Sequence, residues 1–166
     1  MIRLLTGSTH TGKTLLERHG APYLSIDHLK MGLIRSGMCP LTPESTDEAL
    51  TAVLWPVVRE IVKTAVENGQ SLTVEGCYIP FNWREDFDAS CLPHIRFLCL
   101  VFSEAYIRTR FDAIQTHANA IERRKDDSFC TMELLLAENR RNLEACRRRG
   151  LPYYLIDGPY APPLDW

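Results

Sequence analysis

Eight consecutive residues near the start of the chain limit most strongly what it can fold into: Gly7, Ser8, Thr9, His10, Thr11, Gly12, Lys13 and Thr14. The short apolar run at 2–6 predicts a buried strand, and residues 15–19 predict the start of a helix. Between a strand and a helix, the spacing G-x-x-x-x-G-K-T predicts a loop that holds phosphate groups. The glycines let successive backbone N–H groups face an anion, and the helix start adds partial positive charge.

The side chains of this loop predict which phosphates it binds. Lys13 can reach the β- and γ-phosphates of a nucleoside triphosphate and stabilise charge on a transferred phosphoryl group, and the Thr14 hydroxyl can ligate Mg²⁺. His10 is expected only to line the loop. We therefore expect the whole stretch 7–14 to bind ATP together with Mg²⁺.

The rest of the chain alternates between short apolar strands and helical patterns. Further strands are predicted at residues 21–26, 71–76, 94–102 and 152–157, and helices at 27–37, 44–68, about 103–121 and about 131–149. This alternation predicts an α/β fold, in which helices cover both faces of a parallel sheet. With 166 residues the chain is expected to form a single domain. Pro56 should kink or break its helix, because proline removes a backbone donor.

Two acidic residues are predicted at the carboxyl ends of strands, the edge at which parallel sheets bind their ligands. Asp27 could orient or deprotonate the hydroxyl of an acceptor, or it could hold Mg²⁺ through water. It is equally suited to be the N-cap of the helix that follows. Glu75 is expected to support Mg²⁺ and to lie near the acceptor, and the alternative is a strand-end surface carboxylate.

Basic residues between the fourth and fifth predicted strands could contact the phosphates of the nucleotide. These are Arg108, Arg123 and Arg124. Arginine suits this role because its planar fork holds two phosphate oxygens and stays charged. The alternative is a solvated charge run that the neighbouring aspartates neutralise.

The helical region at about 28–68 contains three basic residues that could contact a substrate: Lys30, Arg35 and Arg59. Each can equally be an ordinary surface base. In the last predicted helix, Asn139 interrupts an apolar stripe. An asparagine at such a position either bonds within the core or points into the site.

This order of features resembles that of the small P-loop kinases, which include nucleoside monophosphate, shikimate and gluconate kinases. The resemblance covers nearly the whole chain. The segments at 23–30 (Tyr-Leu-Ser-Ile-Asp-His-Leu-Lys) and 74–80 (Val-Glu-Gly-Cys-Tyr-Ile-Pro) are most similar to small bacterial proteins labelled 2-phosphoglycerate kinase or adenylate kinase-like. Two departures from adenylate kinases are Glu75-Gly76, where those enzymes have Asp-Gly, and Phe81, where they have arginine.

The resemblance implies a three-layer P-loop kinase fold with a five-stranded parallel sheet, a mobile helical region at about 28–68 that binds the acceptor, and a lid over ATP at about 108–130. It makes Lys30, Arg35 and Arg59 the candidates for binding the acceptor, and Arg108, Arg123 and Arg124 the candidates for the lid. The expected function is an ATP- and Mg²⁺-dependent kinase that transfers the γ-phosphoryl group to a small hydroxylated or phosphorylated metabolite. Three alternatives stay open: a nucleoside or nucleotide kinase, a toxin-type kinase of an antibiotic or sugar nucleotide, and an ATP-dependent switch without an acceptor.

Charge and cysteine content bear on partners and location. The net charge of −2 provides no bulk attraction to nucleic acid or to an anionic membrane, so neither is expected as a partner. The six cysteines are scattered without a metal-binding spacing, which favours free thiols in a reducing cytoplasm over a zinc site. The sequence leaves the oligomeric state open.

Overall fold

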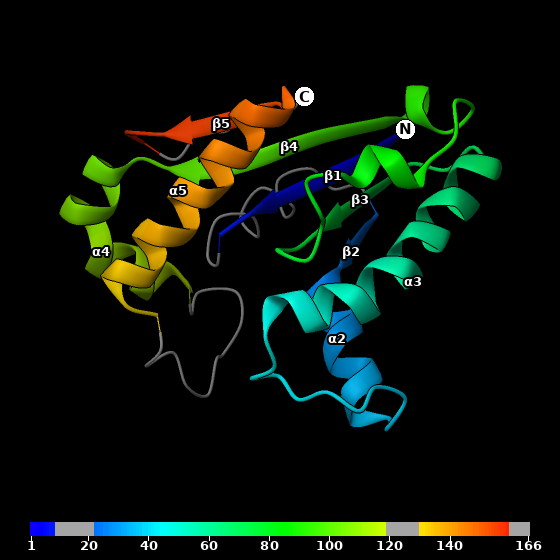
Figure 1. Cartoon of the computed structure of the whole chain (residues 1–166), viewed down its shortest axis with the longest axis horizontal. Helices are drawn as coiled ribbons and strands as arrows, with labels where there is room; N and C mark the ends of the chain where they lie inside the picture. Colours follow the sequence, from blue (N-terminus) through cyan, green and yellow to red (C-terminus); the bar gives the residue numbers. More distant parts are fainter. Residues whose placement is uncertain (9–21, 119–129, 160–166) are drawn as a thin grey trace.

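The computed structural model describes residues 1–8, 22–118 and 130–159, and its centre is a five-stranded sheet (Figure 1). The strands are β1 (Ile2–Gly7), β2 (Tyr23–Ser25), β3 (Leu72–Glu75), β4 (Ile95–Phe102) and β5 (Tyr153–Ile156). They lie in the order β2-β3-β1-β4-β5, and every pairing is parallel. The predicted α/β class with a five-stranded parallel sheet is confirmed.

Four helices are present in the described ranges: α2 (Ile26–Arg35), α3 (Asp47–Glu67), α4 (Glu104–Ala118) and α5 (Met132–Arg149). Two short 3₁₀ turns, η1 (Trp83–Asp86) and η2 (Leu92–His94), precede β4. The helix predicted from residue 15 lies outside the described residues. None of the helices that are described is both long and apolar enough to cross a membrane.

The core is divided between the two faces of the sheet, because successive side chains of a strand point to opposite sides. Leu4 belongs to a cluster that includes Leu54 and Val58 of α3. The next residue, Leu5, belongs to a second cluster with Ile107 of α4 and Leu135 of α5. The central strand is therefore buried on both sides, as its continuous apolar run indicates.

Of the two outcomes expected at Pro56, a kink or a break, the break does not occur, since α3 runs as one helix from Asp47 to Glu67. The buried residues Leu54 and Val58 on either side of the proline hold both halves in the core, and this packing offsets the missing hydrogen bond. The N-cap of α2 is Ser25, not Asp27, because the helix already begins at the fully buried Ile26.

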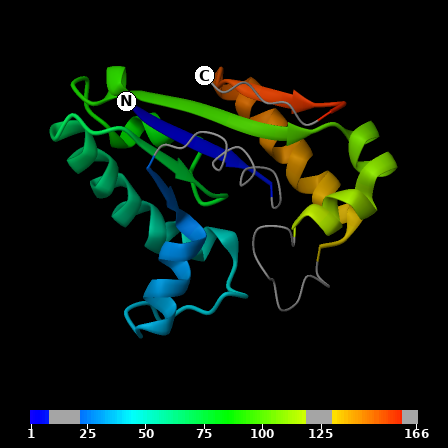
Figure 2. The ribbon, with the colours of Figure 1, turned by 180° about the vertical axis from the view of Figure 1, so that it is seen from behind.

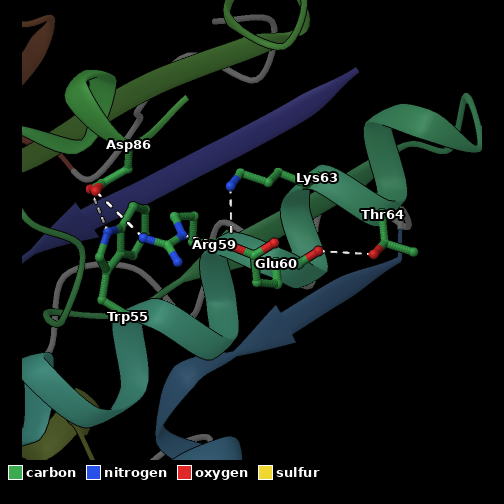
Figure 3. Close-up of polar contacts among 6 residues, drawn as sticks. All are labelled: Trp55, Arg59, Glu60, Lys63, Thr64 and Asp86. Carbon is green, nitrogen blue, oxygen red and sulfur yellow. Dashed lines mark hydrogen bonds and ion pairs between the residues drawn. The ribbon is translucent and has the colours of Figure 1, made fainter. Parts of the chain in front are cut away.

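The segment at 81–90 contains η1 and carries side chains into the core. Trp83 is buried and stacks on Phe97 with ring centroids 5.9 Å apart. Asp86 accepts a 2.8 Å hydrogen bond from the indole N–H of Trp55 on α3 (Figure 3). The segment therefore joins α3 to the sheet.

Candidate functional site

The register of the sheet aligns the carboxyl ends of its three neighbouring strands β2, β3 and β1. Glu75 lies opposite Ser25 on one side and opposite Leu5 on the other. The chain turns just after this row, where the N–H of Gly76 donates to the Leu5 carbonyl at 3.1 Å. Figures 1 and 2 show α2 leaving the sheet at the end of β2, on the side where β1 and β3 also end. This edge is where a parallel sheet binds its ligands.

The predicted phosphate loop begins at this edge, and its first two residues are described. Gly7 ends β1, and Ser8 follows it as a buried residue. The Ser8 hydroxyl accepts a 2.9 Å hydrogen bond from the side-chain amide of Asn139. The remaining loop residues, Thr9, His10, Thr11, Gly12, Lys13 and Thr14, lie outside the described residues. Their roles remain predictions.

Asn139 on α5 bonds within the core, which is one of the two alternatives that its place in an apolar stripe left open. Its Oδ1 atom accepts from the backbone N–H of Phe102 at 2.8 Å, and its Nδ2 atom donates to the Leu135 carbonyl at 2.8 Å. The same Nδ2 atom donates to Ser8. The side chain is only 2% exposed. Asn139 therefore bonds within the core and also fixes the start of the predicted phosphate loop.

Asp27 lies in the first turn of α2, where an acidic side chain is favoured by the helix dipole. Its Oδ1 atom is 2.8 Å from the ammonium of Lys30, one turn later on the same helix. The ammonium also donates to the Tyr78 hydroxyl at 2.9 Å. Lys30, a predicted acceptor-binding residue, thus bonds to Asp27, and the two form a part-buried polar group with Tyr78.

Sequence reasoning missed Tyr78 as a site residue. It follows Glu75-Gly76 at the carboxyl edge and is 4% exposed. Burial raises the pKa of its phenol well above the ordinary value, and the neighbouring Cys77 and Asp27 raise it further. The phenol is therefore neutral at physiological pH. The sequence signal that could have found it is its position three residues after the strand-end carboxylate Glu75. Apolar periodicity alone does not distinguish a tyrosine with a role in the site from one that only packs in the core.

The two predicted carboxylate ligands of Mg²⁺ are both near this edge. Glu75 ends β3 and is 9% exposed, and Asp27 follows β2 by two residues. Carboxylate oxygens are hard ligands of the kind that Mg²⁺ takes, so this donor set fits the ion. The third predicted ligand, Thr14, is outside the described residues. Within the part of the chain that is described, no group of three or more His, Cys, Asp or Glu could hold a metal ion.

The remaining predicted site residues are placed elsewhere or are not described. Arg35 is exposed in the last turn of α2, roughly 12 Å along the helix from Asp27 at the usual rise per residue. Arg59 pairs with Glu60 at 2.7 Å and with Asp86 at 3.7 Å (Figure 3).

Of the three lid candidates, the structure describes one. Arg108 pairs with Glu104 at 2.7 Å on the exposed side of α4. Arg123 and Arg124 lie outside the described residues. In the described parts of the chain, Ser8, Asp27 and Glu75 thus each end or closely follow a strand at the carboxyl edge, and Lys30 bonds to Asp27.

Comparison with known proteins supports the assignment of the fold and does not identify a substrate. No protein-family model matches the chain, and no curated protein matches it significantly in sequence. A provisionally assigned kinase from Chloroflexus aurantiacus has a similar structure, with a TM-score of 0.51 and 20% identity over 99% of this chain and 92% of that one.

Two further solved structures are less similar. A gluconokinase from Sinorhizobium meliloti 1021 has a TM-score of 0.48 and 20% identity, covering 98% of this chain and 83% of that one. A sugar kinase from Janibacter sp. HTCC2649 has a TM-score of 0.48 and 17% identity, covering 99% and 87%. These structures do not support the narrower labels of 2-phosphoglycerate kinase or adenylate kinase. At such low identity, the similarity to the Chloroflexus protein is one of fold.

Proposed function

We propose that this chain is a kinase that transfers the γ-phosphoryl group of ATP to a hydroxyl group of a small molecule in the cytoplasm. The observation that carries the proposal is the position of Asp27. Its carboxylate lies at the same sheet edge as Ser8, the second residue of the G-x-x-x-x-G-K-T motif, and it is held by Lys30. A nucleotide site and a fixed carboxylate at one edge of the sheet are what phosphoryl transfer to a hydroxyl group requires.

In the proposed reaction, Asp27 accepts a hydrogen bond from the acceptor hydroxyl and takes its proton. The hydroxyl oxygen forms a new bond to the γ-phosphorus while the bond between that phosphorus and the ADP oxygen breaks. The products are ADP, the phosphorylated acceptor and one proton held by Asp27. Because the transition state of phosphoryl transfer is loose, a weakly basic carboxylate is sufficient for this role.

Lys30 and Tyr78 support that carboxylate. The ammonium of Lys30 donates a hydrogen bond to Asp27 and so limits the directions in which its side chain can point. Tyr78 accepts a hydrogen bond from Lys30 and so holds the ammonium in place. A fixed carboxylate brings the acceptor hydroxyl to a defined position, which contributes to catalysis by orientation.

ATP and Mg²⁺ are bound in this proposal by the stretch 7–14, with Glu75 and Thr14 as the residues that would hold the metal, and a place for Asp27 on the metal is the alternative to its role as proton acceptor. When bound, Mg²⁺ neutralises charge on the phosphate oxygens. Lys13 stabilises the charge on the transferred group. The arginines Arg108, Arg123 and Arg124 remain candidates for the closed site, and Arg35 and Arg59 for the acceptor.

The test is release of ADP from Mg·ATP, with and without a panel of sugar acids, neutral polyols, phosphoglycerates, nucleosides and nucleoside monophosphates. Stimulation by one class of compound is expected and identifies the acceptor. Lys13→Ala should abolish that turnover while its circular dichroism spectrum and melting temperature stay as in the wild type. A Lys13→Ala protein with normal turnover would overturn the assignment, and ADP release that no acceptor stimulates would favour a nucleotide-dependent switch.

A further inference from the structure

We infer that Asn139 is a positioning residue of the nucleotide site, which sets the affinity for Mg·ATP through Ser8 without touching the nucleotide. The inference rests on the proposed function, because it concerns the same phosphate loop. Its basis is a buried hydrogen bond of 2.9 Å between two side chains that are 131 residues apart in the sequence.

The amide of Asn139 is held at both ends by the backbone around it. Its oxygen accepts from the N–H of Phe102, the last residue of β4, and its nitrogen donates to the carbonyl of Leu135. A backbone N–H can only donate and a backbone carbonyl can only accept. These two contacts therefore determine which end of the amide is oxygen and which is nitrogen.

This orientation determines what Ser8 can do. The amide nitrogen is a donor only, so the Ser8 oxygen must accept from it, and the hydroxyl proton of Ser8 is directed away from Asn139. Ser8 is 6% exposed, so its side chain has little room to turn. Asn139 of α5 thus holds Ser8, the second residue of the phosphate loop, in one rotamer.

Such a contact should affect binding because the loop starts at a glycine. Gly7 has no side chain to limit its backbone, so without the bond to Asn139 the adjacent Ser8 would have more conformational freedom to lose when phosphates bind. A tether formed before the ligand arrives reduces that cost, and removing it should weaken binding. By the usual worth of one hydrogen bond, the expected loss is roughly three- to tenfold in Kd.

A purely structural role for Asn139 makes a different prediction. Deleting a buried, hydrogen-bonded side chain lowers stability whether or not the nucleotide site is involved. Leu135 is the matched control, since it lies one turn earlier on α5, is 1% exposed and packs in the second core cluster. Leu135→Ala should lower the melting temperature at least as much as Asn139→Ala, because it leaves a cavity in the core.

The experiment measures Mg·ATP binding to the full chain by calorimetry, well below the melting temperature of each protein, for wild type, Asn139→Ala, Leu135→Ala, Ser8→Ala and the Ser8/Asn139 double variant. We expect Asn139→Ala to raise Kd roughly three- to tenfold while Leu135→Ala leaves it unchanged. The double variant should bind no more weakly than the weaker single variant, because both changes remove the same bond.

Three outcomes would overturn the inference: equal Kd values for Asn139→Ala and wild type, equal losses in Asn139→Ala and Leu135→Ala, or additive losses in the double variant. If Asn139→Ala does not fold, the side-chain amide resonances of Asn139 in ¹⁵N-labelled wild type give the answer. They should shift when Mg·ATP is added, and unmoved resonances would refute the inference. A wild-type protein that binds no Mg·ATP would refute the proposed function and the inference together, whereas the outcomes above refute the inference alone.

Discussion

The ammonium of Lys30 lies 2.8 Å from the carboxylate of Asp27, and both side chains are largely shielded from solvent. The sequence marked Lys30 as a residue for the acceptor and Asp27 as a residue for catalysis, with nothing to show that they touch. Their spacing of three residues on α2 puts them on one face of the helix, and Tyr78 from the turn after β3 completes the group. The pair gives the proposed function its most direct tests.

Lys30→Met should lower kcat by roughly ten- to a hundredfold, because Asp27 loses a charged hydrogen-bond partner that orients it. Tyr78→Phe is the graded control, since it removes one partner of Lys30 and leaves the ion pair in place, and its effect should be smaller. The measurement is steady-state kinetics with the acceptor found in the screen. If Lys30→Met raised only the KM for the acceptor, Lys30 would bind the acceptor directly.

Asp27→Asn should lower kcat by roughly a hundredfold or more, the usual contribution of a positioned proton acceptor. An amide cannot take the proton from the hydroxyl, although it keeps the size and shape of the side chain. The Kd for Mg·ATP, measured by calorimetry, should change little. A variant that bound Mg·ATP poorly but kept its kcat would instead assign Asp27 to the metal.

Gly76→Ala should destabilise the fold by about 1–3 kcal/mol, because a methyl group there meets an already full core. Gly76 has a φ of 156°, and an added Cβ would lie 2.9 Å from the Cβ of the fully buried Ile26. Gly32→Ala is the matched control, since the space around that glycine is open and alanine favours a helix, so it should stabilise by up to about 1 kcal/mol. Thermal melts of the two variants should move in opposite directions, and equal shifts would contradict the packing argument.

The ionised carboxylate of Asp88 should stabilise the folded state, and this stabilisation should be lost in acid. Its Oδ1 atom accepts from the Ser90 hydroxyl at 2.6 Å and from the N–H groups of Ser90 and Cys91 at 3.0 and 2.9 Å. The Ser90 hydroxyl above all, with these N–H groups, lowers the pKa of the carboxyl from 3.8 to about 2. A lowered pKa stabilises the folded state above the unfolded value, and this contribution is lost as the pH falls through the folded value.

Asp88→Asn keeps the side-chain shape and removes the charge, so it isolates this effect. The melting temperature of the variant should be below that of wild type at pH 6, and the difference should shrink between about pH 4 and pH 2. A difference that stayed constant over this range would show that the charge of Asp88 is not its source.

The sequence by itself determined the succession of strands and helices and where most of them end, because those signals are local. Thr131 caps α5 with its hydroxyl, and Gly150 ends that helix with a φ of 61°, both within a few residues of where the pattern places them. The apolar run at 94–102 likewise predicted a strand, and the structure forms β4 there. Local periodicity also marked Asn139 as unusual, since a polar residue in an apolar stripe needs an explanation.

Only the tertiary structure decided which side chains meet. The order of the strands, with β3 between β2 and β1, aligns Ser25 with Glu75, and no local pattern encodes that pairing. The hydrogen bond between Asn139 and Ser8 joins side chains that are 131 residues apart, and it depends on how α5 packs against the sheet. Contacts of this kind depend on the summed packing of distant segments, whereas helix caps and strand runs depend on neighbours along the chain.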